Sequence, residues 1–203
     1  VQSGVATEVN SNTAHTITEL GLSDYKFVNI TGDANCPGVL GGTVTLAEGE
    51  SITCTITNDD VLIATRTQGF WKTHTSITSS VWSTKLGSDI HIGTATKHLN
   101  NTSKVFGTWY SSIPKKLDGT SRTPIDQARK QCADQLLAAK LNVAEFGAPQ
   151  TIKDQITAAD AAFNGNNINA IKLCGSQMDT YNNSGDSLTF DNPGKASPKV
   201  SQD

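Results

Sequence analysis

The longest helical pattern in the chain is TPIDQARKQCADQLLAAKLNVAEFG, residues 123–147. Thr123 is a good capping residue, Pro124 suits the first helical position, and Asp126 lies near the capping-box position. Gly147 is a typical stop signal. Apolar residues recur at helical spacing between these ends: Ile125, Ala128, Cys132, Leu136, Ala139 and Val143. The stretch therefore predicts one long helix with an apolar face.

Two more helical patterns follow this stretch. The first begins at about residue 151 and ends before Gly165, and it has a face formed by Ile152, Ile156, Ala159 and Phe163. The second is expected to be shorter and has a face formed by Ile168, Ile171, Cys174 and Met178. Residues 184–203 are rich in Gly, Pro, Ser and Lys, which predicts an extended arm or a disordered tail.

The first 60 residues show the alternation of β-strands instead. Within residues 42–58, Val44 and Leu46 share one face, and a turn at residues 47–50 precedes a second alternating run, whose apolar residues are Ile52, Cys54 and Ile56. This pattern predicts a hairpin with one buried face. Residues 15–20 and 25–30 predict two more short strands. Residues 66–114 show no clear period.

Four cysteines lie in two sequence regions, and no C-x-x-C motif is present. Two disulfides are a simpler interpretation than a zinc or redox motif. Three pairings are open, and the grouping in sequence favours Cys36 with Cys54 and Cys132 with Cys174. Disulfides are typical of proteins outside the cytosol. We therefore expect an extracellular location at the cell surface.

Charge and motif content exclude several classes of function. The formal net charge is −3, without a run of like charges, so neither DNA nor RNA is an expected partner. Apolar runs are too short for a membrane span. The chain begins with Val, which suggests a processed or truncated product. Nucleophile and nucleotide-binding motifs are absent. We therefore predict that the protein is not an enzyme and has no catalytic residues, cofactor or metal.

Three stretches of the β region resemble prealbumin-like, SpaA-type β-sandwich modules of surface proteins, pilins and adhesins. They are HTITEL (15–20), YKFVNITG (25–32) and GESITCTITN (49–58). The resemblance implies an antiparallel sandwich over residues 1–60, in which the first strands of the module are absent and one edge is open. It also implies an isopeptide crosslink, with Glu19 as the assisting acid and Asn58 as the acceptor. We favour the simpler interpretation, in which Glu19 is a solvent-facing strand end and Asn58 a turn residue.

The stretch that follows, TQGFWKTH (67–74), resembles a TQGFWK-type domain of unknown function, found after such modules in secreted proteins. Taken together, the expected fold class is α+β. An incomplete antiparallel β-sandwich (prealbumin/Ig-like, 1–60) precedes a mainly helical, disulfide-linked domain (61–183) and an arm or tail (184–203).

Aromatic and histidine residues between the two halves form a candidate ligand surface. Indoles stack on sugars, and imidazoles bind zinc or copper. The candidates for a sugar surface are Trp71, His74, Trp82 and Trp109; His91 and His98 join them as candidates for metal. Because no spacing is diagnostic, we favour the interpretation that the aromatics form a small core and the histidines are surface or capping groups.

N-glycosylation sequons occur at four positions, Asn29, Asn100, Asn101 and Asn182. A chain rich in Asn, Ser and Thr also produces this short motif by chance. Glycans therefore remain one of two open interpretations at this stage.

The open edge leads to the functional hypothesis. Unpaired strand edges must be covered, and a strand donated by another subunit covers them in pilin-type assemblies. Candidate donors are residues 1–9 and 187–190. We therefore expect a structural subunit of an extracellular filament, a homo-polymer. The alternatives are a monomeric carbohydrate- or surface-binding module and, less favoured, a secreted metal-dependent hydrolase.

Overall fold

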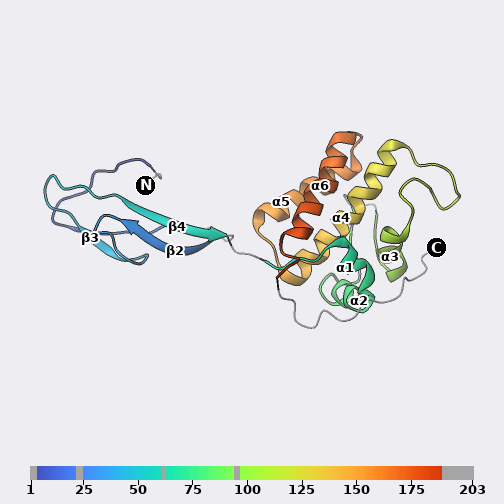
Figure 1. The fold of residues 1–203 in the computed structure, drawn as a ribbon, viewed down its shortest axis with the longest axis horizontal. Helices are drawn as coiled ribbons and strands as arrows, with labels where there is room; N and C mark the ends of the chain where they lie inside the picture. Colours follow the sequence, from blue (N-terminus) through green and yellow to red (C-terminus); the bar gives the residue numbers. More distant parts are fainter. Residues whose placement is uncertain (1–3, 22–24, 61–62, 94–96, 189–203) are drawn as a thin grey trace. The chain divides into compact units, whose positions relative to one another are not determined.

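The computed structural model describes residues 4–21, 25–60, 63–93 and 97–188 (Figure 1). The chain divides into two compact units, residues 1–61 and 62–203, and the division lies next to the predicted boundary at residue 60. The first unit contains strands and the second contains helices. The mixed α and β composition is therefore confirmed.

The N-terminal unit contains two small antiparallel sheets of two strands each. Strand β1 (Ala14–Thr16) pairs with β3 (Thr43–Thr45), and β2 (Tyr25–Gly32) pairs with β4 (Cys54–Asp60). A full β-sandwich is not formed by the residues described.

The predicted hairpin over residues 42–58 is wrong, because β3 and β4 pair with different strands. The turn itself forms, with the Glu50 N–H donating to the Ala47 carbonyl at 3.1 Å. Beyond it, Asp33 fixes the chain beside the end of β2, since its carboxylate accepts from the Thr53 N–H at 2.6 Å. The Cys36–Cys54 disulfide links the start of β4 to the loop that follows β2. These long-range bonds outweigh the local preference for a hairpin.

The alternation predicted for β4 is confirmed. Ile52, Cys54 and Ile56 are half-buried, and the threonines between them are exposed. Strand β2 departs from strict alternation because its register shifts between Phe27 and Asn29, the mark of a β-bulge. The bulge allows Phe27 and Ile30 to turn inward although they are three residues apart.

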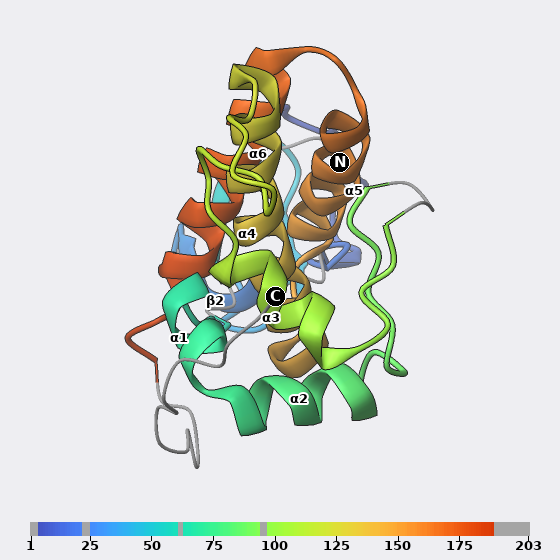
Figure 2. The same cartoon turned by 90° about the vertical axis from the view of Figure 1, so that its right-hand side faces the viewer.

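The second unit is built on α4 (Pro124–Phe146), which packs against α5 (Gln150–Asn164) and α6 (Ile168–Ser184) (Figure 2). The end signals of α4 are confirmed: Thr123 Oγ1 accepts from the Asp126 N–H at 3.2 Å, and Gly147 has a φ of +80°. The Cys132–Cys174 disulfide joins α4 to α6. Helix α6 is longer than α5, contrary to the prediction, because Tyr181 and Asn182 near its end are also buried.

Three short helices occupy the region without a clear period. They are α1 (Gln68–Thr73), α2 (Thr75–Thr84) and α3 (Thr102–Tyr110), and all pack against α4. Thr67 caps α1 by accepting from the Phe70 N–H, and Asn101 caps α3 by accepting from the Lys104 N–H. No helix in the described part of the chain is long and apolar enough to cross a membrane.

Candidate functional site

Each strand of the N-terminal unit has an unpaired edge, because each described sheet contains only two strands. Apolar residues are also left exposed in this unit: Val5, Val9, Leu20, Tyr25, Val28 and Val39. Open ladder groups beside exposed apolar side chains are the features that an additional strand covers. These edges are the first candidate site.

Glu19 and Asn58 meet near one of these edges. The Asn58 side-chain amide donates to Glu19 Oε2 at 3.0 Å. Both residues line a hollow together with Leu20 and Tyr25. Asn58 lies within β4, opposite Phe27, and Glu19 lies outside the described strands, so the interpretation of a turn residue and a strand end is wrong. Glu19 is half-buried. The crosslink itself stays a prediction.

The start of the expected C-terminal arm is packed against the helical unit. The Arg66 guanidinium donates to the carbonyls of Asp186 and Leu188, at 3.2 and 2.7 Å. A side chain at Gly185 would meet the Ile63 carbonyl at 2.2 Å, so the two segments pass very close to each other. The prediction of an extended arm or a disordered tail is therefore wrong for residues 184–188, where α6 ends and the chain turns. Residues 189–203 lie outside the described residues.

The tryptophans form a core and offer no ligand surface. Trp71 is fully buried and donates to Asn142 Oδ1 at 3.0 Å. The indole N–H groups of Trp82 and Trp109 donate to backbone carbonyls at 2.9 Å. His74 lies between α1 and α2, and its ring stacks on Phe70. The candidate sugar surface is therefore contradicted, because the indole faces are enclosed.

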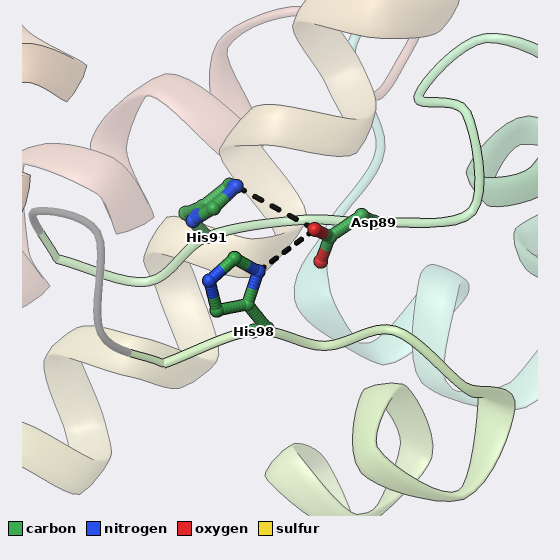
Figure 3. Close-up of side chains that lie close together, drawn as sticks. All are labelled: Asp89, His91 and His98. Atoms are coloured by element: carbon green, nitrogen blue, oxygen red, sulfur yellow. Dashed lines mark hydrogen bonds and ion pairs between the residues drawn. The ribbon is translucent and has the colours of Figure 1, made fainter.

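The structure brings two of the predicted histidines together, with an aspartate that the sequence analysis did not identify. His91 and His98 are opposite each other in an antiparallel bridge, and their ring centroids are 4.1 Å apart. Asp89 Oδ2 lies 2.8 Å from His98 Nδ1 and 3.6 Å from His91 Nε2 (Figure 3). The hydrogen bond from His98 lowers the pKa of Asp89 below its ordinary value. Two imidazoles and a carboxylate in this arrangement can ligate a metal ion.

Local alternation explains why these side chains share a face. Ile90 and Ile92 are each 3 % exposed, so the residues between and before them point outward. The Leu99 N–H donates to the Ile90 carbonyl at 2.8 Å, which sets His98 against His91. The sequence signal was the alternation in Asp89-Ile90-His91-Ile92, which places the aspartate and the histidine on one face before any contact is known.

The sequons differ sharply in accessibility. Asn29, Asn100 and Asn101 are exposed. Asn182 is fully buried and donates to the Gln135 side chain at 2.9 Å. A glycan on Asn182 is incompatible with this packing, so that candidate is contradicted, and the other three remain predictions.

All four cysteines are paired in the two local bridges that sequence grouping favoured. The bridges are consistent with a secreted or extracellular protein. Comparison with protein-family models, curated proteins and solved structures finds no match to this chain.

Proposed function

We propose that the protein is a structural subunit of an extracellular filament or cell-surface assembly, in which the N-terminal unit accepts a β-strand from a second copy. The observation that carries the proposal is the pair of two-stranded sheets with unpaired edges and exposed apolar residues. An added strand would satisfy the ladder groups of an edge and cover such apolar side chains as Tyr25 and Val28.

The N-terminal segment is the better donor of the two candidates. Residues 4–9 are exposed and belong to no strand, and Val5 and Val9 are 56 % and 45 % exposed. In an extended conformation Val5, Thr7 and Val9 lie on one face, which suits insertion into a sheet. The other candidate, 187–190, begins with residues tied to Arg66. Donation from one copy to the next does not close on itself and so builds a fibre.

The test compares full-length variants by electron microscopy and light scattering. V5D/V9D places charges on the donor face and is expected to leave monomers, whereas the unchanged chain forms regular fibres. Val39→Asp is the matched control, since Val39 is exposed in the same unit but outside both donor candidates. A synthetic peptide of residues 1–9 should cap the acceptor and shorten the fibres. Monomers from the unchanged chain, or fibres from V5D/V9D, would overturn the proposal.

A further inference from the structure

The exposed cluster of Asp89, His91 and His98 lies in the helical unit and takes no part in strand donation. We propose that these three side chains bind a single zinc ion. Zinc sites with an open position use three protein ligands of this kind, nitrogen from His and oxygen from a carboxylate, and water as the fourth. The assignment departs from the sequence-based expectation of no metal.

The ligand atoms already lie near the separations that zinc requires. Tetrahedral zinc with bonds of about 2.0–2.1 Å places its ligand atoms roughly 3.3 Å apart. Asp89 Oδ2 is 2.8 Å from His98 Nδ1 and 3.6 Å from His91 Nε2, and all three ligand atoms fall within 4.8 Å of one another. Shifts of about half an ångström bring both of these printed distances to the required value. The two imidazole nitrogens lie within 4.8 Å of each other, and rotation of the half-exposed rings can bring them to the same separation.

Hydrogen bonds from α4 and α5 hold the backbone that carries His91. Lys140 Nζ donates to the His91 carbonyl and to Asp160 Oδ2, both at 2.6 Å. Asp160 Oδ1 in turn accepts from the Gly93 N–H at 2.7 Å. Gly93 has a φ of +82°, and a side chain there would meet Asn164. Because the backbone at His91 and Gly93 is already held by these bonds, less ordering entropy opposes binding at this side of the cluster.

Charge also favours a cation at this point. Asp89 Oδ1 is buried and accepts no hydrogen bond from the described residues, so half of the carboxylate lacks a partner. A cation on Oδ2 would compensate the charge of the whole group. Lys104 lies close enough to act on Asp89 and opposes a second positive charge.

Calorimetric titration of the full chain with zinc chloride, after removal of metal by a chelator, tests the site. One equivalent of Zn²⁺ should bind, and D89N, H91A and H98A should each weaken binding by about tenfold or more. H15Q and H74Q are matched controls that remove the chain's other two histidines and should bind as the unchanged chain does. Far-UV circular dichroism checks that each variant is folded.

The absorption spectrum of bound Co²⁺ gives a second readout, because four-coordinate cobalt absorbs visible light much more strongly than six-coordinate cobalt. A four-coordinate spectrum that is lost in H91A/H98A supports the proposal. Two results would overturn it: no zinc binding by the folded chain at millimolar concentration, or zinc binding that H91A/H98A leaves unchanged. In the second case the cluster is a hydrogen-bonded network in which Asp89 only orients His98.

Discussion

Asn142 joins three segments of the helical unit from inside the core. It is fully buried in α4 and makes four hydrogen bonds. Its Oδ1 accepts from the Arg66 N–H and from the Trp71 indole, and its Nδ2 donates to the Arg66 carbonyl and to Asn182 Oδ1. The Asn142 amide therefore links the segment that leads into α1 with α4 and α6.

Replacing this amide should destabilise the helical unit severely. Asn142→Ala leaves buried donors and acceptors without partners, each costing about 1–3 kcal/mol, so we expect a loss of roughly 3 kcal/mol or more in the free energy of unfolding. Urea denaturation followed by circular dichroism measures it. Asn169→Ala, at an exposed position of α6, should change stability by less than about 0.5 kcal/mol. Equal effects would contradict the role given to Asn142.

Lys130 and Asp134 form a buried ion pair in α4, with Nζ 2.5 and 2.6 Å from the two carboxylate oxygens. Burial outweighs the attraction of Lys130 and Lys72, and it raises the pKa of Asp134 to about 6 from 3.8. Because the folded pKa is the higher one, protonation of Asp134 stabilises the fold. The contribution of Asp134 protonation to the free energy of unfolding therefore grows as the pH falls from about 6 to about 4, and it is lost as the pH rises again.

The double variant K130M/D134L isolates this effect. At pH 7 its stability should equal or exceed that of the unchanged chain, because apolar residues replace a desolvated pair, whereas Asp134→Leu alone should cost about 3–5 kcal/mol. The stability of the unchanged chain relative to the double variant should rise between pH 6 and pH 4. A difference that stays constant over this range would contradict the raised pKa. Thermal denaturation at several pH values provides the comparison.

Side-chain roles were predicted from sequence where they depend on local pattern. Thr123 and Gly147 end α4 as expected because capping is decided within a few residues. Asp89 was missed although its alternation with Ile90 is visible, because only the bridge between His91 and His98 shows that the face is shared by two segments. Asn142 carried no signal, since its partners are distant in sequence.

At the scale of elements, the positions of α4, α5 and α6 were predicted from the sequence, whereas α1–α3 and the pairing of the strands were not. A helix forms its backbone hydrogen bonds within one segment, so its apolar period can be recognised in consecutive residues of the sequence. Strand partners are chosen by the rest of the fold, and Asp33 with the Cys36–Cys54 bridge directs β4 to β2. The short helices α1–α3 gave no periodic signal because each has few buried residues, one in α1 and three each in α2 and α3.

The disulfide between α4 and α6 is expected to stabilise the helical unit by restricting the conformations of the unfolded chain. Its cysteines are 42 residues apart, for which the chain-entropy relation gives about 4 kcal/mol. C132A/C174A should therefore lower the free energy of unfolding of the helical unit by roughly that amount. C36A/C54A is the control and should leave the helical signal unchanged. Urea denaturation monitored at the helical band distinguishes them.

At the scale of the whole molecule, the two units differ in how much apolar surface they bury. Ile30, Val44 and Leu46 are the buried apolar residues described in the N-terminal unit, whereas the core of the helical unit contains all three tryptophans and eight buried residues of α4. A unit of about 60 residues is marginally stable even with a normal core. The N-terminal unit therefore depends strongly on its disulfide and, under the proposed function, also on the strand that a second copy adds.

Calorimetry of the full chain should consequently show two transitions, the lower one from the N-terminal unit. Removing its bridge in C36A/C54A costs about 3 kcal/mol for an 18-residue separation, which should abolish the lower transition and leave the upper one in place. The peptide of residues 1–9 should have the opposite effect, since a ligand that binds only the folded state raises its melting temperature. Two results would contradict a β unit that is completed by an added strand. One is a single transition. The other is a lower transition whose melting temperature changes neither when the Cys36–Cys54 bridge is removed nor when the peptide is added.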